Sequence, residues 1–144
     1  MRVKINEVSK SYGITRALNG VDLDLNTEVS VLSMIGPSGG GKSTLLKILG
    51  GLEVPDCGAV SMNGREVYYQ SEESLLEHRR RNGYLFQSFN LFPHKTAIQN
   101  VTLPLELVHG LSSSAAIEEA NHCLDRFGLI DHANKLPFEL SGGQ

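Results

Sequence analysis

Hydrophobic and polar residues alternate in two segments near the beginning of the chain. The segments Val3–Val8 and Val21–Leu25 show the period of two that is typical of strands with one buried face. A turn-rich stretch that contains Tyr12 and Gly13 lies between them. The pattern therefore predicts an antiparallel pair of strands at the start of the fold.

A nearly continuous apolar run at Val29–Ile35 differs from this alternation and is typical of a strand that is buried on both faces of a parallel sheet. The run leads directly into the glycine-rich segment Gly36–Gly41. Apolar residues at helical spacing come next and end at two glycines in the usual stop position: Leu45, Leu46, Ile48, Leu49, Gly50 and Gly51. We expect the order strand, loop, helix.

Turn and strand signals continue in the middle of the chain. The segments Ala59–Met62 and Arg65–Tyr69 are separated by an Asn-Gly dipeptide, which best suits a type I′ turn and predicts a β-hairpin. A further buried strand is predicted at Gly83–Gln87. Between the hairpin and this strand, Ser71 can cap a helix.

Two more helices are predicted in the last third of the chain. Thr96 and Gln99 form a capping box for the first, which Pro104 has to kink or interrupt. The second runs from about Ser114 to Phe127 and stops at Gly128. We expect its buried face to carry the apolar residues at helical spacing, which are Ala116, Ile117, Ala120, Leu124 and Phe127.

Composition and charge narrow the class of protein. The 144 residues are 40% hydrophobic and 20% charged, which is ordinary for a globular domain with an apolar core. No apolar stretch approaches the roughly 20 residues that a membrane-spanning helix needs, so we expect a cytoplasmic protein. The net charge of -3 provides no basic footprint for nucleic acid, and the basic run Arg79–Arg81 suits a solvated helix end better than a nucleic-acid contact.

Residues 36–43 read GPSGGGKS and satisfy the phosphate-loop pattern. Glycines let successive backbone N–H groups turn inward around phosphate oxygens. Lys42 would supply a cation to the β- and γ-phosphates, and Ser43 would bind Mg²⁺ at the start of a helix whose dipole favours the nucleotide. The predicted ATP-binding residues of this motif are Gly36, Ser38, Gly39, Gly40, Gly41, Lys42, Ser43 and Thr44.

Residues 140–144 read LSGGQ, and this pentapeptide resembles the signature motif of ABC-transporter ATPases. The resemblance implies that Ser141, Gly142 and Gly143 grip the γ-phosphate of ATP bound to a partner subunit. Such a role suits a second anion-binding nest. Further segments stand in the family's order along the whole chain: Ser9–Gly13, Pro55–Gly58 and Phe86–His94.

The same resemblance assigns roles to two more residues. Tyr12 stands where the family places an aromatic ring that stacks on adenine, although a lone tyrosine in a turn is otherwise more often a packing residue. Gln87 matches the Q-loop glutamine, which senses Mg²⁺ and the attacking water and couples to the membrane subunit; without such neighbours it would be an ordinary surface residue. The expected catalytic residues are Lys42 and Gln87, and the expected Mg²⁺ ligands are Ser43 and Gln87.

The resemblance implies an α/β fold, with a P-loop NTPase core of the ABC type, an antiparallel β subdomain and the start of a helical subdomain. We expect the sheet-containing core in residues 1–88, and the Q-loop with the helical subdomain in residues 89–144. The implied ligands are ATP and Mg²⁺. The implied partners are a second nucleotide-binding subunit, in a head-to-tail dimer, and permease subunits docked near the Q-loop at the cytoplasmic face of the membrane; nucleic acid is not expected.

The implied function is ATP hydrolysis coupled to transport. Phe89–His94 looks like the ATPases of polar amino-acid importers, whereas Asn100–Leu105 is also similar to lipoprotein-release and macrolide-export types. A soluble ABC-type ATPase of DNA repair or translation, and a non-catalytic binding module, stay open as alternatives. In the family a Mg²⁺-binding Asp and a catalytic Glu follow the signature, so we expect the 1–144 chain by itself to be poorly stable and inactive.

Overall fold

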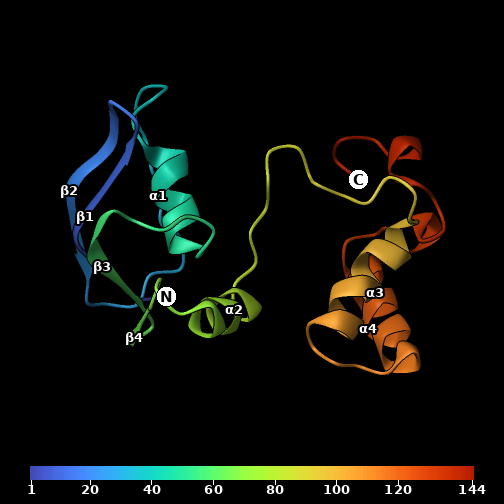
Figure 1. The fold of residues 1–144 in the computed structure, drawn as a ribbon. Helices are drawn as coiled ribbons and strands as arrows, with labels where there is room; N and C mark the ends of the chain where they lie inside the picture. Colours follow the sequence, from blue (N-terminus) through green and yellow to red (C-terminus); the bar gives the residue numbers. More distant parts are fainter. The chain divides into compact units, whose positions relative to one another are not determined.

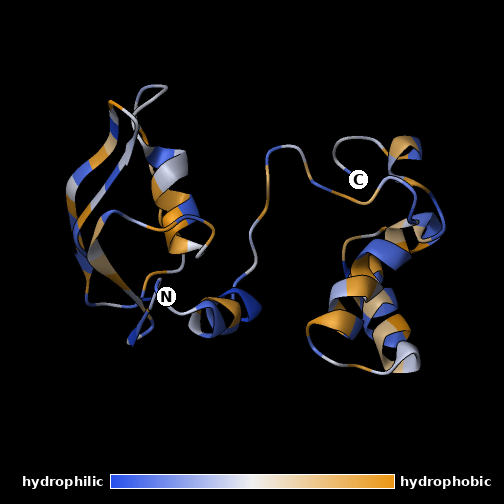
Figure 2. Ribbon diagram, viewed as in Figure 1, coloured by the Kyte–Doolittle hydropathy of each residue, from blue (hydrophilic) through white to orange (hydrophobic).

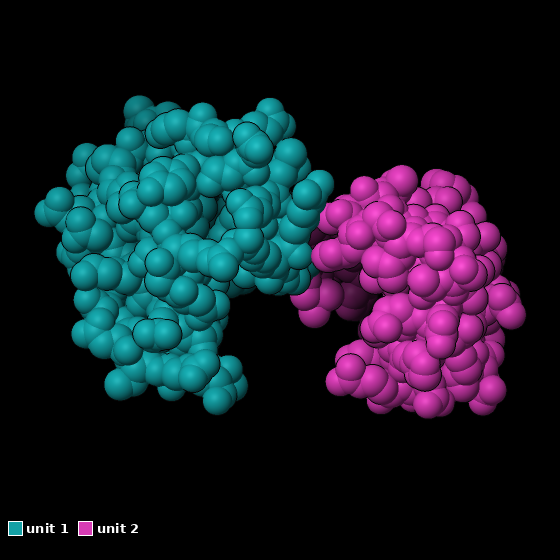
Figure 3. Space-filling model, turned by 90° about the horizontal axis from the view of Figure 1, so that it is seen from below, with its two compact units in different colours: residues 1–84 teal, residues 85–144 magenta.

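A four-stranded antiparallel sheet forms the first part of the structure (Figure 1). The computed structural model describes all residues from Met1 to Gln144 and divides them into two units, Met1–Tyr84 and Leu85–Gln144 (Figure 3). The sheet belongs to the first unit and has the spatial order β2-β1-β3-β4. Its strands are β1 (Val3–Tyr12), β2 (Thr15–Leu25), β3 (Cys57–Met62) and β4 (Arg65–Glu66).

The predicted opening pair of strands is confirmed and is longer than the alternation indicated. β1 and β2 pair antiparallel up to the turn, where Tyr12 stands opposite Thr15. On its other side β1 pairs with β3 only as far as Ser9, which stands opposite Cys57. Hydrophobic and hydrophilic positions alternate along the β1 and β2 ribbons (Figure 2), because one face of the sheet is buried and the other is not.

The predicted β-hairpin is also confirmed. Asn63 and Gly64 have φ angles of 51° and 78°, and positive values at both positions are what a type I′ turn requires. Met62 pairs with Arg65 across the turn. β4 is shorter than predicted, since regular pairing ends one residue after Arg65.

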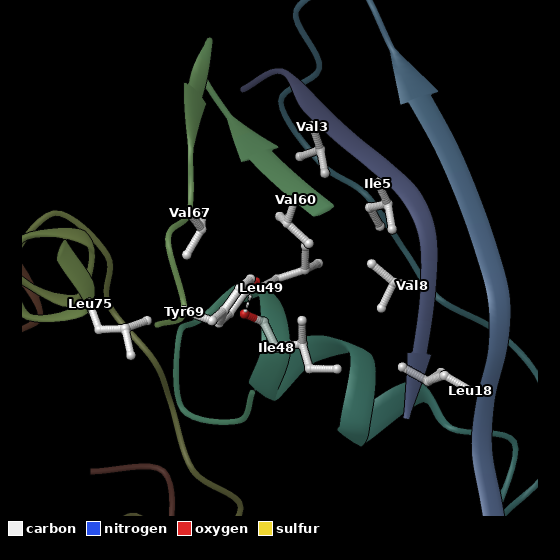
Figure 4. Packing of buried hydrophobic residues seen from close by; sticks show 10 residues of the cluster. All are labelled: Val3, Ile5, Val8, Leu18, Ile48, Leu49, Val60, Val67, Tyr69 and Leu75. Atoms are coloured by element: carbon white, nitrogen blue, oxygen red, sulfur yellow. Dashed lines mark hydrogen bonds between the residues drawn. The ribbon is translucent and has the colours of Figure 1, made fainter. Parts of the chain in front are cut away.

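The helix predicted after the glycine-rich segment is α1 (Lys42–Leu49), which ends at Gly50. Ile48 is fully buried, and it packs with the apolar face of the sheet in one core (Figure 4). Tyr69 enters the same core, and its hydroxyl donates a hydrogen bond of 2.9 Å to the carbonyl oxygen of Ile48. The other buried members of the core are Val3, Ile5, Val8, Leu18, Leu49, Val60, Val67 and Leu75.

The carbonyl end of α1 is held by the next helix, α2 (Glu72–Arg80). The Nε2 atom of His78 donates to the carbonyl oxygen of Leu49 at 2.7 Å. The Nε atom of Arg79 donates to the carbonyl oxygen of Gly51 at 2.8 Å. These bonds satisfy carbonyl groups that have no partner inside a helix.

The second unit consists of two long helices and two short 3-10 turns. Thr96 and Gln99 form the predicted capping box on the first helix. Pro104 does not interrupt that helix. No helix of the chain has the combination of length and apolar character that crossing a bilayer requires. The elements are α3 (Ala97–Leu107), α4 (Ser113–Arg126), η1 (Ile130–His132) and η2 (Pro137–Glu139).

The predicted buried face of α4 is correct at three positions and wrong at two. Ala116, Ala120 and Leu124 are buried. Ile117 and Phe127 are 48% and 76% exposed. A helix buries only the stripe that meets its neighbours, and α4 meets mainly α3 and η1 within this unit.

The two strands predicted for a parallel sheet are not formed, which corrects the sequence interpretation. Residues 29–35 and 83–87 contain no strand. Val31, Ile35 and Leu85 are 80%, 95% and 82% exposed. A strand that is buried on both faces needs paired neighbours and a layer on each side, and the four-stranded sheet of this fold includes neither segment.

Candidate nucleotide-binding site

The phosphate loop, residues Gly36–Gly41, lies at the surface of the first unit directly before α1. Gly39 and Gly41 have φ angles of 79° and 77°, in a region that residues with a side chain rarely adopt. Gly41 also lies against β2, because a Cβ atom there would overlap the carbonyl oxygen of Ala17. The glycines therefore permit both the turn of the backbone and its close approach to the sheet.

The side chain of Lys42 folds back onto the phosphate loop. Its Nζ atom donates to the carbonyl oxygen of Gly36 at 2.9 Å and to that of Pro37 at 2.6 Å. An ammonium group has three protons to donate, so these two bonds leave one for a phosphate oxygen. The loop thus holds a positive charge beside its own backbone N–H groups.

The N-cap residue of α1 differs from the N-cap residues of the other α-helices. Gly41 stands at the N-cap position of α1 and provides no side-chain acceptor. The first-turn N–H groups therefore remain open to an anion, at the positive end of the helix dipole. The other helices each have a hydroxyl that accepts from a first-turn N–H group, on Ser71, Thr96 and Ser112.

Ser43 and Thr44 occupy the first turn of α1, and Ser43 is exposed. A hydroxyl oxygen is a hard ligand of the kind that Mg²⁺ accepts together with phosphate oxygens and water, so the exposed Ser43 side chain fits the ion. Gln87, the other predicted ligand, is exposed in the second unit. Its role beside Ser43 stays a prediction.

Tyr12 ends β1 at the tip of the strand pair, and its side chain is 47% exposed. Its ring contacts a cation, because the Nζ atom of Lys10 lies 5.5 Å from the ring centroid. An exposed ring in this position is open to a further planar group, which agrees with the predicted stacking role but does not test it.

The signature residues form an exposed turn at the end of the second unit. The backbone N–H of Ser141 donates to the Oε1 atom of Gln144 at 2.9 Å, and the N–H of Gln144 donates back to the Ser141 carbonyl at 3.0 Å. This turn lines a cavity of about 340 Å³ together with the segment that follows Gln87: Ser88, Phe89 and Leu91. Two predicted functional segments are therefore neighbours within this unit.

The sequence analysis missed a charged cluster beside Tyr12. The Nζ atom of Lys10 lies 3.0 Å from Glu53 and 3.5 Å from Asp56, and it donates to the carbonyl oxygen of Val54 at 2.7 Å. One sequence signal points to part of it, since residues two apart on a strand share a face and Lys10 is two residues before Tyr12. Nothing in the sequence shows that residues 53–56 join them.

Comparison with known proteins agrees with the fold and the motifs. Residues 18–144 match the protein family described as ABC transporter. The chain is 42% identical to a methionine import ATP-binding protein of Brucella abortus, over 99% of this chain and 38% of that protein. It is 41% identical to a lipoprotein-releasing system ATP-binding protein of Bacteroides thetaiotaomicron, over 99% of this chain and 65% of that protein.

A solved structure supports the same assignment. It is a dimeric ATP-binding cassette in a post-hydrolysis state with ADP and Pi, and it is 37% identical with a TM-score of 0.86. The match covers 99% of this chain and 64% of the cassette, so the chain spans less than two thirds of these relatives. The expected fold class is confirmed, although the two parallel strands are not formed here. The chain belongs to the ABC transporter family.

Proposed function

We propose that this chain binds MgATP at the phosphate loop and is part of an ATPase subunit that drives transport. The observation that carries the proposal is the start of α1, where uncapped N–H groups and the Lys42 ammonium face the same loop. A triphosphate is the ligand that suits several inward N–H donors, a fixed cation and a helix N-terminus together. ADP and Pi in the related cassette add support.

Each predicted residue has a separate task in this proposal. Lys42 donates a hydrogen bond from its remaining N–H to the β- or γ-phosphate, and its positive charge offsets part of the phosphate charge. Ser43 contributes its hydroxyl to Mg²⁺, which neutralises phosphate charge when it is bound. Tyr12 offers an exposed ring to the base. Gln87, by the family resemblance, senses Mg²⁺ and the attacking water.

The signature turn acts on a second ATP in the proposed assembly. Ser141, Gly142 and Gly143 are exposed, so the Ser141 hydroxyl and the N–H groups of the two glycines are available to a phosphate held by a partner subunit. The related cassette is described as dimeric, which supports a pair of subunits; the head-to-tail arrangement is part of our proposal. Membrane permease subunits would dock near Gln87, where Phe89 and Leu91 are exposed.

We favour a small polar solute, such as an amino acid, as the transported substance. The relative from Brucella abortus is described as a methionine import protein, and the segment Phe89–His94 resembles amino-acid importers. Lipoprotein release is the second candidate, because the relative from Bacteroides thetaiotaomicron has nearly the same identity to this chain. Both candidates place the protein at the cytoplasmic face of a membrane.

Calorimetric titration with MgATP tests the nucleotide site. Lys42→Ala removes a charge-assisted hydrogen bond to phosphate, worth about 1.5–3 kcal/mol, so affinity should fall roughly ten- to hundredfold. Lys47→Ala is the matched control, because Lys47 lies in the last turn of the same helix and is exposed. Equal MgATP affinity in the unchanged chain and the Lys42 variant would refute the assignment.

A further inference from the structure

We propose that Lys10 is a positioning residue for the nucleotide base, because it fixes the ring of Tyr12 on which the base stacks. The inference rests on the proposed function and extends it to a residue outside the phosphate loop. Its starting point is the cation over the Tyr12 ring, with the Lys10 Nζ atom 5.5 Å from the centroid. A cation on one face of the ring leaves the other face for the base.

The Lys10 side chain is held in place far more firmly than the ring that it contacts. Its side chain is only 14% exposed, whereas Tyr12 is 47% exposed. Three acceptors surround the ammonium: Glu53 at 3.0 Å, the Val54 carbonyl oxygen at 2.7 Å and Asp56 at 3.5 Å. One hydrogen bond and two ion pairs therefore hold the ammonium beside the ring.

The charge of Lys10 is as fixed as its position. The hydrogen bond that the Lys10 ammonium donates to Glu53 is the largest cause that raises the pKa of Lys10, and the attraction of the Glu53 and Asp56 carboxylates adds to it. The charged form of Lys10 is therefore favoured over the neutral form. A permanent cation gives a constant attraction to the electron-rich ring face.

The segment that holds Lys10 also holds the backbone on both sides of it. The N–H of Asp56 donates to the carbonyl oxygen of Ser9 at 2.9 Å, and the N–H of Ser11 donates to the Asp56 carboxylate at 2.7 Å. These bonds begin where the ladder between β1 and β3 ends, at Ser9. Residues 53–56 thus continue the support of β1 up to the residue before Tyr12.

The experiment compares a ligand that has a base with one that has none. Calorimetry is run with MgATP and with magnesium tripolyphosphate on the unchanged chain and on Lys10→Met. We expect Lys10→Met to lose about three- to tenfold in MgATP affinity and nothing in tripolyphosphate affinity. Lys10→Arg, which keeps the cation, should restore MgATP affinity to within about twofold. Lys4→Met is the matched control, since Lys4 lies on the same strand in an ion pair with Asp24 at 3.1 Å.

Two further variants make the outcome decisive. Lys10→Gln keeps a donor for the Val54 carbonyl and should show the same loss for MgATP alone, so it replaces Lys10→Met if that variant does not fold. In a Tyr12→Ala background, Lys10→Met should have no further effect, because the ring that Lys10 positions is gone. Unchanged MgATP affinity in Lys10→Met and Lys10→Gln, or an equal loss for both ligands, would overturn the positioning role alone. Failure of the unchanged chain to bind either ligand would overturn the proposed function as well.

Discussion

Replacement of Gly41 by alanine tests the close contact between the phosphate loop and the sheet. Gly41 has a φ angle of 77°, and its backbone lies against Ala17 and Leu18 of β2. A new methyl group would overlap the Ala17 carbonyl oxygen and stand 2.8 Å from the Cδ2 atom of Leu18. The Leu18 side chain can shift by itself, but the Ala17 carbonyl belongs to the backbone of β2 and can move only with the strand.

The expected loss of folding stability in Gly41→Ala has two parts, a backbone part and a steric part. A residue with a Cβ atom in the left-handed region costs about 1–2 kcal/mol. Forcing an additional methyl group into a filled space costs about 1–3 kcal/mol more, because strand or loop must move. Gly41→Ala should therefore lower the free energy of unfolding by about 2–5 kcal/mol, a large share of the stability of a small domain.

Gly39→Ala separates the two parts. Gly39 has a φ angle of 79°, nearly that of Gly41, but nothing lies within 4 Å of a Cβ atom built on it. It should therefore lose only the backbone part, about 1–2 kcal/mol. Urea unfolding followed by far-ultraviolet circular dichroism measures both variants. Equal losses in the two variants would show that the loop does not lie against β2 as described.

Three other predictions concern single side chains. Burial raises the pKa of Tyr69, so the phenol of the unfolded chain loses its proton first as the pH rises above about 10. Between pH 9 and 11 the free energy of unfolding should therefore fall by about 1 kcal/mol more in the unchanged chain than in Tyr69→Phe. Urea titration at each pH measures the difference. Thr96→Ala removes the cap of α3 and should cost about 1 kcal/mol in a thermal melt, whereas Thr96→Ser should cost little. Tyr12→Ala should lose about 1 kcal/mol of MgATP affinity by calorimetry and Tyr12→Phe almost none; a neutral alanine variant would exclude stacking.

Local signals predicted the elements whose causes lie within a few residues. The Asn63-Gly64 turn needs only two residues that tolerate positive φ, and the capping box of Thr96 and Gln99 closes within one turn. The phosphate loop belongs to the same class, since its glycines and Lys42 are consecutive. Features of this kind can be predicted because the residues that cause them lie within the same short segment of sequence.

Features that depend on distant partners were predicted poorly. The run Val29–Ile35 has the composition of a buried strand, but a strand forms only within a sheet, and the sheet of this fold does not include the run. The role of Lys10 was missed for a related reason, because in the sequence Lys10 looks like an ordinary solvated lysine on an alternating strand. Its partners Glu53 and Asp56 reach it through the fold, and no spacing rule links positions so far apart.

The hydrogen bonds at the carbonyl end of α1 fix the position of that end of the helix. The helix has eight residues, too few to persist alone in water, and spans about 12 Å. The donors of these bonds are Tyr69, His78 and Arg79, which all come from one short stretch of the chain. The other end bears the N–H groups of the phosphate loop and lies against Ala17 of β2, so the direction in which these groups point depends on contacts at both ends of the helix. We therefore expect a substitution of His78 or Arg79 in α2 to lower nucleotide affinity by tilting α1, without any contact to the ligand.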